Sequence, residues 1–325
     1  MRFVTFRRPN SLVQQFGIKV GETHVVDVEH GTAARLAIGM TRSKAKEIAR
    51  AITPSQAISF MSGGETSLAA AQDTFGFSRD AIASGDDIIS PDGQSALFRL
   101  DDVVLDAPVP NAGKFIAAGK NFIEHLAEMT SMANPERPVA FAQMNTTLIG
   151  PDQTISIPPE TGRLDYEVEV AVIIGKPAYM VSADNAMSYI FGYTIFNDLS
   201  ARDLYRAEQG SGIPLLGKNL ANCAPMGPHI VTSDELSDPS SLRLMMRING
   251  EIRQSSTLRS MLFGIAELVS WWSRIGLEPG DIISSGTPSG VAAGRKPGEE
   301  PWWLKPGDVA EAEVEGLGVL RTTFA

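Results

Sequence analysis

The order of the strands and helices expected after residue 106 is the feature that most restricts the fold of this chain. Apolar and β-branched runs typical of strands recur there, at residues 154–157, 168–174, 189–195, 230–232, 242–248, 281–284 and 309–314. Only residues 122–129 and 261–274 have the clear spacing of helices. Strand and helix therefore do not alternate regularly enough for a doubly wound sheet or a TIM barrel. The pattern predicts an α+β fold, mostly β, with sheets folded over one another.

The first 106 residues predict a small, separate α/β domain. Residues 16–20 and 24–28 flank Gly21-Glu22 as in a hairpin, and residues 43–51 and 66–72 are typical of helices. A turn-prone, proline-containing segment at residues 107–113 follows. We therefore place the domain boundary near residue 106 and assign residues 107–325 to a second, larger domain.

Composition and missing motifs exclude several classes of protein. The 325 residues include 28 basic and 38 acidic side chains, and the net charge of −10 repels phosphate backbones and anionic lipids. We therefore expect no nucleic-acid partner and no membrane partner. The sole cysteine, Cys223, and an amino terminus without an apolar run predict a cytoplasmic protein. Dinucleotide, P-loop, serine-hydrolase and structural-zinc sites lack their signatures in this sequence.

Two acidic side chains stand out on the strand expected at residues 168–174. Glu167 and Glu169 alternate with valines, so both project from the same face of a strand. Like charges at this spacing repel one another unless they face solvent or share a cation, and a solvated face is the simpler interpretation of an isolated pair. A third carboxylate, Asp198, follows an apolar run and would reach the rim of a sheet. Three carboxylates that leave open positions suit Mg²⁺ or Mn²⁺.

Seven motifs, in order between about residues 115 and 320, give the chain a family resemblance. They are Gly-Lys-Asn-Phe-x-x-His-x-x-Glu, Asp-Tyr-Glu-Val-Glu, Gly-Tyr-Thr-x-x-Asn-Asp-Leu-Ser-Ala-Arg-Asp, Gly-Lys-Asn, Gly-Pro-x-Ile-Val-Thr, Asn-Gly-Glu-x-Arg-Gln and Ser-Gly-Thr-Pro-Ser-Gly-Val. The sequence resembles the fumarylacetoacetate hydrolase family. The resemblance implies a mixed β-sandwich roll after the small α/β domain, a homodimer, and Mg²⁺ or Mn²⁺ on Glu167, Glu169 and Asp198. Asp165 is expected to make a structural hydrogen bond instead of a metal contact.

The resemblance also assigns a lid and a cation. His125 and Glu128 lie at positions i and i+3 of the expected helix, close enough for the carboxylate to orient the imidazole. On spacing alone, an ordinary surface helix is the simpler interpretation. The motif match implies instead a lid segment near residues 119–135 that orders over the substrate and positions a water. Lys218 corresponds to a lysine that faces a developing enolate oxygen.

Three further residues match positions that contact the substrate in the family. Arg202 would bind a substrate carboxylate, with an ion pair to Asp203 as the alternative. Thr287 lies in the loop that holds the carboxylate end of the substrate, and Tyr205 stands where many members have a glutamine. Gln143 stands where many members have a lysine, so a second substrate carboxylate lacks one possible partner.

The resemblance implies metal-dependent hydrolysis of a C–C bond in a 2,4-dioxo acid of the acylpyruvate type. Fumarylpyruvate and maleylpyruvate are examples from aromatic compound catabolism, and the products would be pyruvate and a second carboxylic acid. His125, assisted by Glu128, would activate the attacking water, and Lys218 would stabilise the departing enolate. The alternative is an isomerase, decarboxylase or dehydratase of a related anionic 2-oxo acid or diacid. The same stabilised enolate serves all of these reactions, so the sequence leaves the choice open.

Overall fold

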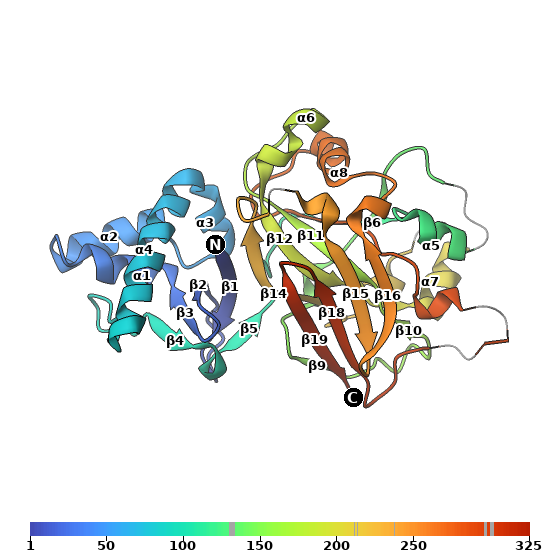
Figure 1. Ribbon diagram of the computed structural model, residues 1–325, viewed down its shortest axis with the longest axis horizontal. Coiled ribbons are helices and arrows are strands. Elements are labelled where there is room, and N and C mark those ends of the chain that lie inside the picture. The colour runs from blue at the N-terminus through green and yellow to red at the C-terminus, as the bar shows by residue number, and fades with distance from the viewer. Residues whose placement is uncertain (130–133, 211, 213, 237, 296–297, 300–301) are drawn as a thin grey trace.

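The computed structural model describes residues 1–129, 134–210, 212, 214–236, 238–295, 298–299 and 302–325. A small amino-terminal unit with helices on one side of its strands lies beside a larger part built mainly of strands (Figure 1). This architecture confirms the predicted α+β, mostly β class. Among the described residues, no helix is both long and apolar enough to cross a membrane.

The amino-terminal unit packs helices against a small antiparallel sheet. Its strands are β1 (Arg2–Arg7), β2 (Gln15–Val20), β3 (His24–Asp27), β4 (Leu97–Arg99) and β5 (Val104–Asp106). Its helices are α1 (Val28–Leu36), α2 (Arg42–Ile52), α3 (Ala57–Ser62) and α4 (Gly64–Ser84). The rings of Phe3, Phe16 and Phe60 lie 5.2–5.3 Å apart between the two layers and form the centre of its core.

Two predicted elements of this unit have different ends in the structure. The second hairpin strand ends at Asp27 because its side chain accepts a hydrogen bond from the His30 backbone N–H (2.8 Å) and thereby starts α1. The helix expected at residues 66–72 continues to Ser84, since Phe75, Phe77 and Ala81 pack against the core. Tertiary packing therefore extends a helix through a segment whose polar residues favour a loop.

One long sheet joins the two parts of the chain. Its order is β4-β3-β2-β1-β14-β12-β11-β17-β6-β7, and β1 pairs antiparallel with β14 through Phe3 and Ile230. The strands contributed by the larger part are β6 (Phe115–Gly119), β7 (Val139–Ala142), β11 (Val168–Ile174), β12 (Ile190–Asn197), β14 (Ala224–Thr232) and β17 (Ile282–Ser284). The predicted boundary near residue 106 falls at the end of β5, which pairs with β1. Strands from both sides of that boundary thus belong to one sheet.

A second sheet packs against the long sheet and closes a β-sandwich. Its strands, in order, are β16 (Glu251–Thr257), β15 (Arg243–Ile248), β18 (Val309–Val314), β19 (Gly318–Phe324) and β9 (Thr154–Ile155). Alternate residues of β15 and β18 are buried, as expected for strands covered on one face, whereas every residue of β11 is buried. One face of β11 therefore contributes to the sandwich core, and the other carries Glu169 at its start and packs Ala171 and Ile173 in a second apolar cluster.

Short helices and strands connect these layers. The helices are α5 (Ile123–Glu128), α6 (Ala183–Ala186), α7 (Arg202–Gln209) and α8 (Ile265–Trp272), and the short strands are β8 (Leu148–Ile149), β10 (Leu164–Asp165) and β13 (Ser200–Ala201). The sequence predicted α5 and α8 but missed α7. The reason is that α7 has mostly polar residues and buries little besides Arg202, so it has no apolar stripe.

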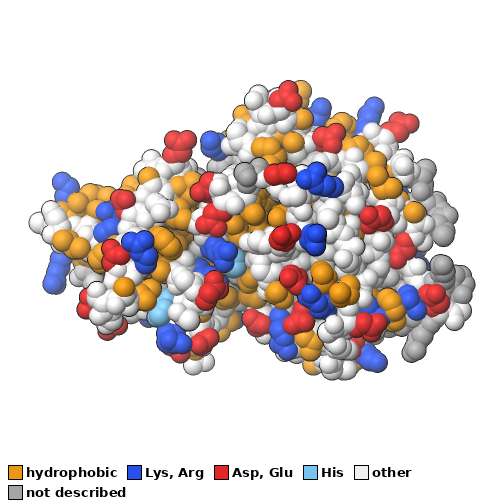
Figure 2. Space-filling model, in the orientation of Figure 1, with side chains coloured by type: hydrophobic (Ala, Val, Ile, Leu, Met, Phe, Trp, Pro, Cys, Tyr) orange, Lys and Arg blue, Asp and Glu red, His pale blue; other side chains and the backbone are white. Residues whose placement is uncertain are grey.

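The surface of the molecule is mixed in charge. Acidic and basic side chains are interspersed over the face in Figure 2, and hydrophobic side chains gather where the two parts meet. A cavity of about 390 Å³ lies at this junction, with Met1, Met61, Leu68 and Phe191 in its lining. Beside this cavity, Phe191 of the larger part packs against Phe3 and Phe60 of the amino-terminal unit.

Candidate active site

Three buried carboxylates meet at one edge of the β11–β12 pair. Glu169 lies in β11, Glu167 directly precedes β11, and Asp198 directly follows β12. Because the two strands are antiparallel and Val168 pairs with Asn197, the start of one lies beside the end of the other. One carboxylate oxygen from each of these residues lies within 4.8 Å of the other two. The structure thus brings together the three residues that the sequence predicted as metal ligands.

Burial disfavours the charged form of two of the three carboxylates in the cluster. Burial raises the pKa of Asp198 to about 7, with Lys218 opposing and Glu167 adding to the shift. Burial also raises the pKa of Glu169 well above its usual range, and repulsion from Asp198 and Glu167 contributes. The Oδ1 atom of Asp198 is buried and has no hydrogen-bond partner among the described residues. An oxygen-only donor set with an unpartnered oxygen suits a hard divalent cation such as Mg²⁺ or Mn²⁺.

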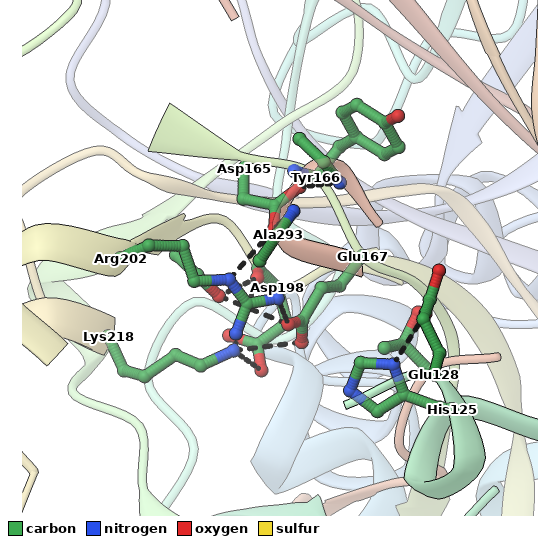
Figure 3. A network of polar contacts seen from close by, with 12 residues as sticks. His125, Glu128, Asp165, Tyr166, Glu167, Asp198, Arg202, Lys218 and Ala293 are labelled. Atoms are coloured by element: carbon green, nitrogen blue, oxygen red, sulfur yellow. Dashed lines mark hydrogen bonds and ion pairs between the residues drawn. The ribbon is translucent and has the colours of Figure 1, made fainter. Parts of the chain in front are cut away.

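Lys218 and Arg202 both point into this cluster (Figure 3). The Nζ atom of Lys218 lies 2.8 Å from Oε2 of Glu167 and 2.7 Å from Oδ2 of Asp198. Arg202 donates from Nη2 to Glu167 Oε1. Burial opposes the charge on Glu167, but Lys218 and Arg202 outweigh that effect and lower its pKa to about 2. Glu167 is therefore held ionised by two cations, and the positive charge of both cations is engaged by carboxylates.

The second partner of Arg202 is Asp165, not Asp203 or solvent. The short strands β10 and β13 pair through Asp165 and Ser200, which brings Arg202 Nε to 2.8 Å from Asp165 Oδ2. Asp203 instead accepts hydrogen bonds from the Thr161 hydroxyl and the Gly162 backbone N–H. The alternative ion pair considered for Arg202 is thus absent. Contact between Arg202 and a substrate carboxylate stays a prediction. For Nε or Nη2 to make that contact, the atom would have to leave its present partner, Asp165 or Glu167.

Asp165 makes the structural hydrogen bonds that the sequence led us to expect. In addition to Arg202, it accepts the backbone N–H groups of Tyr166 (2.9 Å), Ala292 (2.7 Å) and Ala293 (3.0 Å). Its side chain is fully buried. Asp165 therefore ties the segment at residues 290–294 to Arg202 and, through Arg202, to the metal-ligand candidate Glu167.

The predicted lid pair lies on α5 at the side of the cluster (Figure 3). The Nδ1 atom of His125 lies 3.3 Å from Oε2 of Glu128, and Glu128 Oε1 accepts the Gly290 backbone N–H at 3.0 Å. A Cβ atom on Gly294 would come within 2.0 Å of Glu128 Cδ, so this carboxylate occupies the space beside a glycine. The predicted lid segment 119–135 continues beyond α5 into residues 130–133, which lie outside the described residues.

A pocket of about 90 Å³ joins these groups. Residues of α5 and α7, two helices at the right of Figure 1, contribute to its lining. Eight of the nine predicted site residues line it, and they are His125, Glu167, Glu169, Asp198, Arg202, Tyr205, Lys218 and Thr287. Glu128, the ninth, contacts His125. The lining also includes Lys120, Phe141, Arg206 and Gln209, which the sequence did not single out. Prediction of α7 would have found Arg206, since it lies one helical turn after Arg202.

The hydroxyl of Thr287 is already engaged by protein atoms. It donates to the Val168 carbonyl oxygen (3.0 Å) and accepts from Nε2 of Gln254 (2.9 Å). Gln254 is buried, and its Oε1 accepts the Val168 backbone N–H at 3.0 Å. Gln254 belongs to the Asn-Gly-Glu-x-Arg-Gln motif, but its sequence position gave no sign that it supports the pocket wall beside Glu169.

Comparison with known proteins agrees with this geometry. The family model "Fumarylacetoacetate (FAA) hydrolase C-terminal" matches residues 114–325. A rat (Rattus norvegicus) protein named oxaloacetate tautomerase Fahd2a, mitochondrial, is 37% identical over 268 residues, which cover 82% of this chain and 79% of the relative. Its named activity belongs to the isomerisations and not to the hydrolyses.

Two solved structures extend the comparison. The 5-carboxymethyl-2-hydroxymuconate delta-isomerase from Mycobacterium smegmatis is 29% identical, with a TM-score of 0.67 over 100% of this chain and 98% of that chain. The fumarylpyruvate hydrolase from Pseudomonas aeruginosa, in complex with Mn²⁺ and pyruvate, is 26% identical, with a TM-score of 0.60 over 67% of this chain and 91% of that chain. Together with the two-sheet fold and the carboxylate cluster, these matches show that the chain belongs to the fumarylacetoacetate hydrolase family.

Proposed function

We propose that this protein is a metal-dependent enzyme that interconverts the keto and enol forms of a 2-oxo diacid of the oxaloacetate type. The observation that carries the proposal is that His125, Lys218 and the three clustered carboxylates line one pocket of about 90 Å³. The base His125 and the cation Lys218 thus face the same pocket, in which an enolate can form. The sequence favoured hydrolysis and held isomerisation as the alternative. The similarity to the rat oxaloacetate tautomerase supports the alternative better.

A divalent ion on Glu167, Glu169 and Asp198, when bound, would supply Lewis acidity that makes the carbon beside a 2-oxo group easier to deprotonate. His125 would remove a proton from C3, and Glu128 would keep its imidazole in the required orientation. The C3–H bond breaks, a C2–C3 double bond forms, and a proton is added to the 2-oxygen. The substrate is neither oxidised nor reduced, and no group leaves it. Lys218 would stabilise negative charge on that oxygen during the transfer.

Hydrolysis of a 2,4-dioxo acid is the second candidate, and the His125–Glu128 pair is compatible with it. The carboxylate is fixed by both His125 and the Gly290 N–H, an arrangement that suits activation of a water as well as removal of a carbon-bound proton. The similarity to fumarylpyruvate hydrolase supports this candidate, and the Mn²⁺ in that structure supports Mn²⁺ or Mg²⁺ as the ion here. Under either reaction, the first step requires the same base.

Product analysis separates these candidates. The purified protein, with Mg²⁺ or Mn²⁺, is mixed with enol-oxaloacetate, fumarylpyruvate or acetylpyruvate, and the products are followed by ultraviolet absorbance and NMR. Faster keto–enol exchange of oxaloacetate without pyruvate supports the tautomerase, whereas pyruvate with a second acid from a dioxo acid supports the hydrolase. Carbon dioxide from oxaloacetate would indicate a decarboxylase. A rate no faster than that of the metal ion alone would refute the enzymatic proposal, and His125→Ala should give this result.

We extend the proposal to assembly, ligand and compartment. A small anionic keto acid is the proposed ligand, and a homodimer is the proposed assembly, which light scattering on a sizing column tests. The sequence predicted a cytoplasmic location, whereas the name of the rat relative gives a mitochondrial one. Fractionation of the source cells distinguishes these two compartments.

A further inference from the structure

We propose that Lys120 and Arg206 form a second anion-binding subsite at the mouth of the pocket, which binds the distal carboxylate of a dicarboxylic substrate. This inference rests on the proposed function, because it names the substrate class of the same pocket. Both side chains line the pocket, and both residues are exposed, so they lie on its rim. Neither side chain forms a hydrogen bond or ion pair within the part of the chain that the structure describes. Each therefore has a charge available for a ligand.

The inner part of the pocket offers no surplus positive charge. The carboxylates of Asp165, Glu167, Glu169 and Asp198 carry a formal charge of −4, and Arg202 and Lys218 carry +2 in contact with them. A divalent ion would bring the total to zero. The first carboxylate of a substrate would bring the total to −1 and would be held by direct contact with that ion. A second carboxylate needs positive charge from outside this inner set.

Gln143, which lies next to the segment of Lys218, cannot supply that charge. Gln143 is buried, and its Nε2 donates to the Thr147 hydroxyl (2.7 Å) and to the Lys218 carbonyl oxygen (3.0 Å). Both bonds are internal, so this amide braces the segment that carries Lys218. The unpaired positive charges among the pocket-lining residues are those of Lys120 and Arg206, which come from other elements.

The chain fixes the starting points of both side chains. Arg206 lies one turn after Arg202 on the same face of α7, and Arg202 is anchored to Asp165. Lys120 has a left-handed backbone (φ 55°), which is uncommon for a residue with a long side chain. The next residue, Asn121, holds it there by donating to the Ser285 carbonyl oxygen (2.8 Å) and accepting the Phe263 N–H (2.9 Å). Two long, charged side chains thus start from anchored backbone and line the same pocket.

Binding of a matched ligand pair tests the subsite without any need for turnover. Isothermal calorimetry with the Mn²⁺-loaded protein compares 2-oxoglutarate with 2-oxopentanoate, which differ in the terminal carboxylate. The wild type should bind the diacid more tightly than the monoacid. In the Lys120→Gln/Arg206→Gln variant, the Kd of the diacid should rise about tenfold and that of the monoacid should change little. The control variant Arg42→Gln/Lys44→Gln removes the same two charges from exposed positions of α2 and should retain the wild-type preference.

The outcomes separate this inference from the proposed function. Absence of a preference for the diacid in the wild type, equal losses for both ligands, or an unchanged ratio in the double variant would each overturn the subsite. A diacid preference that disappears in the double variant supports it, even if oxaloacetate tautomerisation is never detected. With oxaloacetate turnover, the double variant should raise KM about tenfold and leave kcat within about twofold, since neither residue contacts the reacting carbon.

Discussion

Gly294 leaves the space in which the Glu128 carboxylate lies, so Gly294→Ala tests whether that carboxylate orients His125. The added Cβ atom would lie 2.0 Å from Glu128 Cδ and 2.1 Å from its Oε1. Carbon atoms in contact are ordinarily about 3.5 Å apart or more, so the carboxylate must move by about 1.5 Å. The backbone of Gly294 lies outside the left-handed region, and alanine therefore adds volume without backbone strain.

The size of the effect follows from the contacts that would be lost. A displacement of about 1.5 Å breaks the 3.3 Å contact with His125 and the 3.0 Å hydrogen bond from the Gly290 N–H. Residues that orient a reacting group typically contribute about 10- to 100-fold in rate, and we expect a loss of that size in kcat. Stability should fall by only about 1 kcal/mol, because the Glu128 side chain is 17% exposed and can recover contact with water.

The assay is a double-mutant cycle in steady-state kinetics with whichever substrate turns over. If Gly294→Ala acts by displacing Glu128, then adding it to Glu128→Gln should cost little more than Glu128→Gln alone. Gly162→Ala is the matched control, since a Cβ there meets no atom within 4 Å. Full additivity of the two changes, or a kcat for Gly294→Ala within twofold of wild type, would refute the assignment of Glu128 as the residue that orients His125.

Further predictions concern the metal, pH and a buried ion pair. A chelator should lower the melting temperature of the metal-loaded protein, because an ion at about 100 times its Kd stabilises the folded state by about 2.7 kcal/mol, and Glu169→Gln should remove this response to metal. Burial lowers the pKa of His229 from its usual value of 6.5 to about 4. As pH falls from 6.5 to 4, the imidazole therefore binds a proton in the unfolded state but not in the folded state. The free energy of unfolding should decrease by up to about 3 kcal/mol across that window, and a denaturation series with His229→Gln should show a flatter dependence. Asp165→Asn should destabilise by about 3 kcal/mol, since buried Arg202 loses a charged partner, and a denaturation midpoint equal to that of the wild type would contradict this.

The metal-ligand candidates could be found from the sequence because the information is local. Glu167 and Glu169 share a strand face by alternation alone, and Asp198 directly follows an apolar run that could be recognised as a strand. The family motifs added the lid pair and the cations around the cluster. In the larger part, seven of the fourteen strands and the position of the cluster could thus be predicted, because they depend on neighbours along the chain.

Contacts between distant segments could not be predicted in the same way. Arg202 pairs with Asp165, 37 positions earlier, although the adjacent Asp203 was the obvious partner in the sequence. Gly294 has no motif that marks its proximity to Glu128, 166 positions earlier, because only the folded chain brings them together. Polar α7 lacked the apolar periodicity that identifies helices, and for that reason Arg206 could not be placed near the pocket.

The pairing of β1 with β14 has a consequence for attempts to isolate the catalytic part. The family model begins at residue 114, so a natural truncation would remove β1 and the other strands of the amino-terminal unit. The outer edge of β14 would then present unpaired N–H and C=O groups near Ile230 and Val231. Bare strand edges recruit strands from other molecules. By pairing β1 with β14, the amino-terminal unit covers this edge and should thereby disfavour edge-to-edge aggregation.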